Sequence, residues 1–152
     1  MAALGRVLVL VLSLVVGSLL LAGQVQAATS CHKINAKGVG QDLGGGTTTA
    51  RIIGGGLLHG TTVGAFAPSG LSPVVLLAGT VTFTTNRGTL TVTVNGTFDT
   101  SSGAFTASGP VTASTGKLAG ATGALTFSGV ENLSTGSFTE DVTGNICVDL
   151  AP

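Results

Sequence analysis

The chain has 152 residues and a formal net charge of zero, with 25 Gly, 23 Thr, six Phe and neither Trp nor Tyr. Its few basic residues form no cluster and aromatic platforms are scarce, which excludes the usual surface for binding nucleic acid. The two Cys and two His lack the ligand spacing of a structural zinc site, and no glycine run has the context of a phosphate loop, so the sequence predicts neither a metal nor a cofactor.

Residues 1–27 have the layout of a secretory signal peptide. Arg6 gives a basic start, residues 7–22 are almost wholly apolar, and Val25 and Ala27 are small residues at the positions that a signal peptidase reads. We therefore predict a secreted or cell-envelope protein whose mature domain spans 28–152. An uncleaved membrane anchor is the alternative, although about 16 apolar residues fall short of the roughly 20 that span a bilayer. The membrane would be a partner only through this segment.

Residues 28–152 alternate between strand-like segments and turns rich in Gly, Ser and Asn. Thr, Val and Phe favour strands, whereas Gly marks turns and bulges. The expected strands are His32–Gly40, Thr47–Ile53, Leu57–Phe66, Val74–Thr84, Thr89–Phe98, Ala104–Ala113, Ala121–Glu131 and Ser137–Val148, with one helical turn over 115–120. Short, evenly spaced strands joined by tight turns are typical of an antiparallel sandwich or barrel.

Along these strands apolar side chains alternate with threonines. In Thr89–Phe98, for example, Leu90 and Val92 share one face while Thr91 and Thr93 share the other. Such alternation predicts strands with one face in a core and one face in water. By the same rule, the predicted core contains Val75, Leu77, Val81, Phe83, Leu90, Val92, Val94, Phe98, Phe105, Ala107, Val111, Leu125, Phe127, Phe138, Val142, Ile146 and Val148.

Cys31 and Cys147 lie close to the two ends of the predicted mature chain. In an oxidising compartment such a pair is most simply one disulfide, closing a loop of roughly 115 residues, and two unpaired buried thiols are the alternative. Both cysteines have the outward parity of their strands, so they can meet if the first and last strands are neighbours. Because such neighbours close the sheet and remove its edges, the sequence predicts an all-β fold, a closed antiparallel barrel of about eight strands, over an open sandwich.

The segment Gly109–Gly129 reads G-P-V-T-A-S-T-G-K-L-A-G-A-T-G-A-L-T-F-S-G, two strands joined by a glycine-rich turn. It resembles the allene oxide cyclase and dirigent barrel superfamily, and the hairpins built from Gly79–Phe83, Gly88–Phe98 and Gly103–Thr106 fit the same pattern. The resemblance extends over about Gly38–Val148. It implies an eight-stranded barrel with an apolar cavity that binds or orients small hydrophobic molecules. No motif allows the catalytic residues of that superfamily to be carried over to this chain.

Three ionisable side chains, Glu140, Glu131 and His32, share the inward parity of their strands. If all three point into the barrel, two carboxylates and an imidazole lie in an apolar interior, where burial raises carboxyl pKa values, as at acid–base catalytic sites. The alternatives place them in water, with His32 at the rim, Glu131 in a turn, and Glu140 displaced by a β-bulge at Asp141.

The sequence favours a secreted barrel that is not an enzyme, and that either holds a small apolar ligand or acts as a cell-surface accessory. One alternative is a cyclase- or dirigent-type barrel that steers a reactive hydrophobic substrate, and another is a structural envelope protein with no ligand. An apolar pocket with convergent polar groups would favour the first two. A barrel filled by its own leucines and phenylalanines would favour the third. Ligand identity and oligomeric state do not follow from the sequence.

Overall fold

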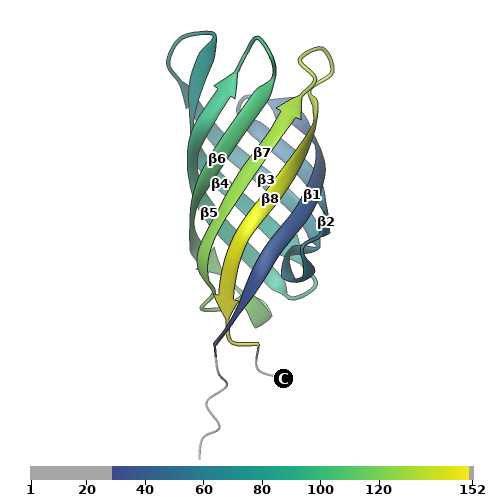
Figure 1. Cartoon of the computed structure of the whole chain (residues 1–152), viewed down its shortest axis with the longest axis vertical. Coiled ribbons are helices and arrows are strands. Elements are labelled where there is room, and N and C mark those ends of the chain that lie inside the picture. The colour runs from purple at the N-terminus through teal and green to yellow at the C-terminus, as the bar shows by residue number, and fades with distance from the viewer. Residues whose placement is uncertain (1–28, 151–152) are drawn as a thin grey trace, which may run out of the picture.

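Alternating apolar and threonine side chains produce one closed antiparallel sheet in the computed structural model, which describes residues 29–150 (Figure 1). Eight strands follow one another around the barrel in chain order, and the first pairs with the last. The strands are β1 (Ser30–Gly44), β2 (Thr47–Gly54), β3 (Gly60–Ser69), β4 (Val74–Thr85), β5 (Gly88–Asp99), β6 (Ala104–Ser114), β7 (Thr122–Glu131) and β8 (Ser137–Val148). The predicted barrel is therefore confirmed.

The two ends of the barrel are built differently (Figure 1). The turns at 45–46, 70–73, 100–103 and 132–136 form one end, which we call the mouth. The other end, which we call the closed end, holds both ends of the described chain, the turn at 86–87 and two single-turn 3₁₀ helices. These helices are η1 (Gly56–Leu58) and η2 (Gly116–Leu118), and η2 is the helical turn expected over 115–120.

Large apolar side chains fill the closed end. Leu57 and Leu58 of η1 and Leu118 of η2 are buried, and they belong to the same core as Phe83 and Leu90. The leucine side chains of the two short helices thus extend the hydrophobic core between the strands across the closed end of the barrel. A fully filled interior of this kind leaves no room for a ligand at the closed end.

The prediction of a strand over Leu57–Phe66 is wrong at its beginning, because β3 starts at Gly60. The preceding glycines Gly54 and Gly55 have φ angles of +77° and +70°, in the left-handed region that favours glycine. This backbone conformation ends β2 and turns the next two leucines inward as η1. The apolar pair resembled a strand in the sequence because periodicity does not distinguish a short strand from a single buried turn.

The strand faces are as the alternation predicted. The predicted core residues are buried, apart from Val75, Leu77, Phe98, Phe105 and Val111, which are half-buried. On the outer face, threonine hydroxyls pair between neighbouring strands, as between Thr82 and Thr91 at 3.0 Å and between Thr93 and Thr112 at 2.9 Å. Over β4, β5 and β6 the outer face therefore carries threonine hydroxyls that are hydrogen-bonded across neighbouring strands.

Two neighbouring isoleucines on β2 give a matched test of these faces. Ile52 is 0% exposed and Ile53 is 49% exposed. Ile52→Val is expected to lower the free energy of unfolding by about 0.5–1.5 kcal/mol, because it removes one buried methyl group. Ile53→Val is expected to change it by less than about 0.5 kcal/mol. Chemical denaturation of both variants checks the prediction, and equal effects at the two positions would contradict the assigned register.

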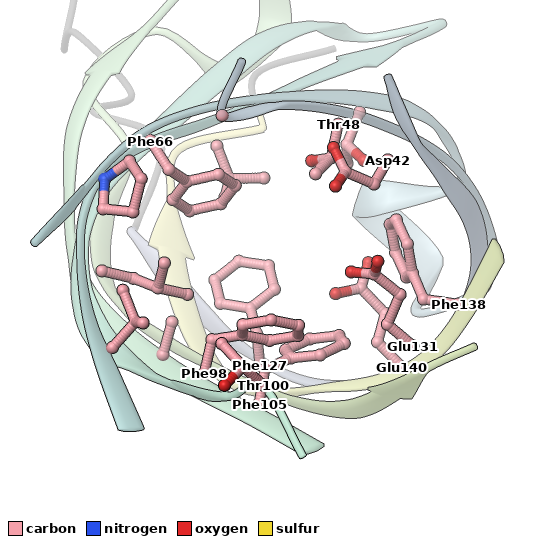
Figure 2. A pocket seen from close by; sticks show the side chains of 17 residues that line it. Asp42, Thr48, Phe66, Phe98, Thr100, Phe105, Phe127, Glu131, Phe138 and Glu140 are labelled. Carbon is pink, nitrogen blue, oxygen red and sulfur yellow. The ribbon is translucent and has the colours of Figure 1, made fainter. Parts of the chain in front are cut away.

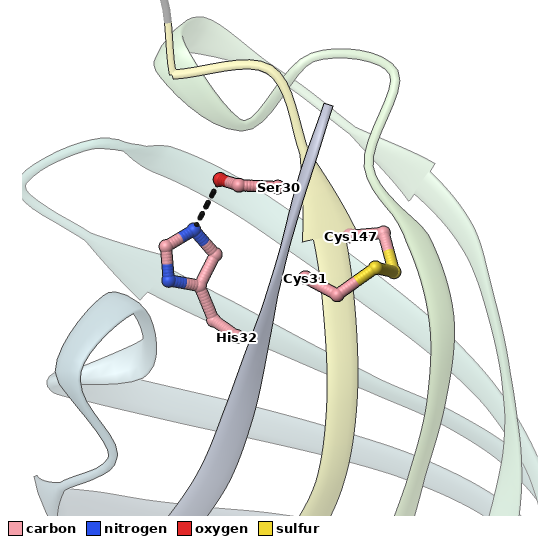
Figure 3. Close-up of a disulfide and its surroundings, with 4 residues drawn as sticks. All are labelled: Ser30, Cys31, His32 and Cys147. Carbon is pink, nitrogen blue, oxygen red and sulfur yellow. Dashed lines mark hydrogen bonds between the residues drawn. A yellow bond between two sulfur atoms is a disulfide. The ribbon is translucent and has the colours of Figure 1, made fainter. Parts of the chain in front are cut away.

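The disulfide closes the seam between β1 and β8 (Figure 3). Cys31 and Cys147 are direct partners in the antiparallel register, with their Cα atoms 3.9 Å apart, and their sulfur atoms are bonded. This confirms the predicted pairing and excludes two free thiols. A disulfide of this kind is consistent with an extracytoplasmic compartment.

The predicted signal peptide, residues 1–27, lies outside the residues that the structure describes. Within residues 29–150, neither the length nor the apolar character of any helix is sufficient for a membrane span. The choice between a cleaved signal peptide and a retained anchor therefore stays a prediction from the sequence.

Candidate functional site

The mouth half of the barrel contains a cavity of about 330 Å³. On β1 the inward-facing side chains become smaller towards the mouth, and the side chains of Glu140 and Phe138 enter the space that this leaves. Along β1 the inward positions change from Ile34, which is buried in the core, to Gly38 and Gly40. The predicted core residues Phe98 and Phe105 are only half-buried because they line this cavity.

Most of the cavity wall is apolar and aromatic (Figure 2). Five of the six phenylalanines of the chain line it, namely Phe66, Phe98, Phe105, Phe127 and Phe138. Phe105 and Phe138 pack edge to face, with ring centroids 5.7 Å apart and an interplanar angle of 89°. Such a wall favours the burial of apolar atoms of a ligand.

Three carboxylates occupy one side of the same cavity. Figure 2 shows the oxygen atoms of Glu140 and Glu131 pointing into the space, with Asp42 nearby. They come from the adjacent strands β8, β7 and β1. Glu131 lies opposite Phe138, and Glu140 lies two residues further along β8, so Glu140 is the deeper of the two glutamates.

A glycine on the neighbouring strand β1 makes room for the side chain of Glu140. Its register partners are Gly38 on β1 and Gly129 on β7. A Cβ atom placed on Gly38 would lie 2.6 Å from Cγ of Glu140, closer than carbon atoms approach one another. The register is continuous on both sides of Glu140, so the β-bulge considered at Asp141 is absent and Glu140 keeps its inward parity.

The electrostatic environment favours the protonated form of the two glutamates, Glu131 and Glu140. Burial raises the pKa of Glu140 to about 7, from an ordinary value of 4.5. Burial also raises the pKa of Glu131, and the negative charge of Asp42 raises it further. Glu140 therefore titrates close to neutral pH, which is the behaviour of groups in binding and catalytic sites.

Basic side chains do not neutralise this acidic side. Within residues 29–150, all five lysines and arginines are exposed and none lines the cavity. Lys37, the nearest in sequence register, forms an ion pair with Asp141 on the outer face of the barrel. The carboxylates thus face an apolar space without a positive partner among the described residues.

His32 does not join the two glutamates. It is half-buried on β1 near the closed end, opposite Ile146, and its Nε2 lies 2.9 Å from Oγ of Ser30 (Figure 3). The structure therefore brings together Glu131 and Glu140, while His32 lies at the other end of the barrel and outside the cavity lining.

Asp42 is a member of the site that the sequence analysis missed. The first strand was expected to end at Gly40, but β1 continues to Gly44 and places Asp42 on the inward side of the mouth. Strand parity could have identified Asp42, because it lies two residues after Gly40 and four after Gly38, which are inward-facing positions of the same strand. Oδ1 of Asp42 also accepts a hydrogen bond of 2.8 Å from the backbone N–H of Gly44, which holds the carboxylate at the turn.

The residues of the cavity define its chemistry. Ionised carboxylates accept hydrogen bonds or pair with a cation, and protonated Glu140 can donate a hydrogen bond. Thr48, Thr62 and Thr100 add hydroxyl groups to the lining. In the part of the chain that the structure describes, no three His, Cys, Asp or Glu side chains are grouped so as to hold a metal ion.

Comparison of the chain with protein-family models, with curated proteins and with solved structures finds no match. Membership of the allene oxide cyclase and dirigent superfamily therefore stays a prediction from the glycine-rich segment Gly109–Gly129. The barrel and its cavity are known from the structure of this chain and not from a relative.

Proposed function

We propose that this protein is a secreted or cell-envelope barrel that binds a small, mainly apolar molecule in its mouth cavity without transforming it. The observation that carries the proposal is the cavity of about 330 Å³ with five phenylalanines in its wall. That volume lies at the lower end of the range of about 300–1,000 Å³ for small-molecule sites. Eight-stranded barrels are also just wide enough to hold one small ligand.

The surface around the mouth supports an apolar ligand. Six large apolar side chains are exposed on the turns and strand ends of this end of the barrel. They are Leu43, Leu71, Val74, Leu76, Val130 and Leu133. Exposed apolar side chains gathered around a cavity are typical of a binding site. Leu43, Val74, Leu76 and Val130 have the outward parity of their strands, so they make the outside of this end of the barrel apolar.

The extracytoplasmic location rests on two features. Residues 1–27 have the pattern of a signal peptide, and the Cys31–Cys147 disulfide suits an oxidising compartment. In such a location the protein would act as a carrier, or as a surface accessory that captures its ligand outside the cytoplasm.

Titration with 1-decanol, an uncharged probe with a linear apolar chain, tests the proposal. We expect the wild-type protein to bind it by isothermal titration calorimetry and to gain thermal stability as the probe concentration rises above its Kd. Ala107→Phe places a ring in the cavity and is expected to weaken binding at least about tenfold. Ala113→Phe, on the same strand but exposed, is the matched control and should bind as the wild type does. Native mass spectrometry of freshly purified protein should also reveal a bound apolar molecule.

Absence of binding in the wild-type protein, together with an empty purified protein, would overturn the proposal. That result would favour a structural envelope protein without a ligand, for which the filled closed end is the supporting feature. Equal binding by Ala107→Phe and the wild type would also overturn it, because the probe would then occupy some other place.

Catalysis is the second candidate function, and the pKa of Glu140 near 7 favours it. A carboxyl group that titrates near neutral pH beside an apolar cavity can act as a general acid or base. If the protein turns over an unsaturated apolar substrate, Glu140→Gln should abolish turnover and His32→Ala should leave it unchanged, because His32 lies outside the cavity. Turnover that survives Glu140→Gln would remove Glu140 from this role.

A further inference from the structure

We propose that the ligand of the mouth cavity is a lipophilic cation, an apolar body that carries one protonated amine. This inference rests on the proposed binding function and names the chemical class of the ligand. It follows from where the cavity places its charges and its aromatic rings, and from the absence of any compensating cation among the residues that line it.

The charge of the cavity is of one sign. Among residues 29–150, Asp42, Glu131 and Glu140 are the only ionisable side chains that line it, contributed by β1, β7 and β8. The other five strands contribute apolar groups, backbone and threonine hydroxyls to the lining. Carboxylates in a partly desolvated space attract a cation more strongly than they would in water, because the effective dielectric constant is lower.

Three of the five phenylalanine rings lie away from the glutamates, while Phe138 lies beside them. Figure 2 shows Glu131 and Glu140 on one side of the cavity and the rings of Phe98, Phe105 and Phe127 gathered on another. A molecule with an ammonium group at one end can place that group against the glutamates and its apolar chain against the rings. The arrangement therefore matches an amphiphile in both charge and shape.

The same arrangement disfavours other amphiphiles. A fatty acid would bring a fourth negative charge beside the three carboxylates, and like charges repel. An uncharged alcohol avoids repulsion, but it leaves the ionised carboxylates desolvated without a counter-ion, which is costly. The amine is the one head group of the three that compensates the charge of the cavity.

Three probes with the same apolar chain separate these cases: decylamine, 1-decanol and decanoate. At pH 8 an alkylamine with a pKa close to that of lysine, about 10.4, is protonated. We expect decylamine to bind at least about tenfold more tightly than 1-decanol, and decanoate at least about tenfold more weakly, as measured by calorimetry below the micellar concentration of each.

The preference is expected to depend on Glu140. Glu140→Gln should reduce the advantage of decylamine over 1-decanol several-fold, at nearly constant side-chain shape. Asp141→Asn is the matched control, because it removes the same charge from the next residue on the outer face. Lowering the pH from 8 to 5.5 should weaken decylamine binding to the wild type, since Glu140, whose pKa is raised to about 7, becomes protonated. Glu131, whose pKa is also raised, and Asp42 are the other carboxyl groups that face the cavity.

The outcomes separate this inference from the proposed function. If 1-decanol binds in the cavity and decylamine binds no more tightly, the cationic class is wrong while the apolar binding site stands. If none of the three probes binds, both proposals fall. If Asp141→Asn weakens decylamine as much as Glu140→Gln does, the preference reflects the net charge of the protein and the inference is overturned.

Discussion

Replacing both Cys31 and Cys147 by serine is expected to lower the free energy of unfolding by about 4 kcal/mol. The two residues are 116 positions apart, so the disulfide closes a very long loop and restricts the unfolded chain strongly. Serine fits the native site, because Cys31 is exposed and Cys147 is half-buried, and the loss should reflect the cross-link itself. Urea denaturation monitored by circular dichroism measures the effect.

The position of the disulfide explains why the effect should be large. Seven of the eight strand pairings join neighbours in sequence, and only the pairing of β1 with β8 joins the two ends of the chain. Closing that seam costs the most chain entropy. The wild-type protein with its disulfide reduced should match the double variant. A loss below about 0.5 kcal/mol in both samples would show that the strand pairing holds the seam without the cross-link.

Glu140→Gln is expected to stabilise the protein at pH 8 by up to about 3 kcal/mol. The pKa of Glu140 is raised on folding from 4.5 to about 7, so the folded state holds this proton more tightly than the unfolded state does. For a carboxyl group with a raised pKa, stability is greatest below pH 4.5 and is lost as the pH rises to about 7. Glutamine carries no charge, so the variant should lack this loss.

Free energies of unfolding measured from pH 4 to pH 8 check this prediction. The wild type should lose stability across the interval, with a smaller contribution of the same sign from Glu131, whose pKa is also raised. Asp141→Asn should keep the slope of the wild type. A wild-type stability that is constant or rises between pH 5 and pH 7.5 would contradict the burial of an unpaired Glu140.

Much of the fold could be predicted from strand parity, that is, from which face of its strand each side chain occupies. Because side chains alternate strictly between two faces, the core positions and the outward cysteines followed from the spacing of apolar residues. The pairing of Cys31 with Cys147 then required the first and last strands to be neighbours, and the structure confirms this closure. The start of β3 was misplaced because the left-handed conformation of the preceding glycines cannot be seen in an apolar pattern.

Strand parity predicted less of the candidate site than of the fold. It gives the face of a side chain but not its height along the barrel. His32 and the partner of Glu140, Gly38, are six positions apart on β1, or about 20 Å at the rise of a strand, which separates the imidazole from the glutamates. Asp42 was missed for a related reason, since Gly38 and Gly40 weaken the strand pattern just before it. The cavity depends on how the side chains pack in three dimensions, which the order of residues along the strands does not show.

Chemical-shift mapping of backbone amides during titration with 1-decanol tests the central claim, binding in the mouth cavity, most directly. The account predicts saturable shifts at residues such as Phe105, Phe127 and Glu140, which line the cavity, and none at Leu57 or Leu118 in the filled closed end. Shifts confined to the outer threonine face, or no saturable shifts at all, would contradict it.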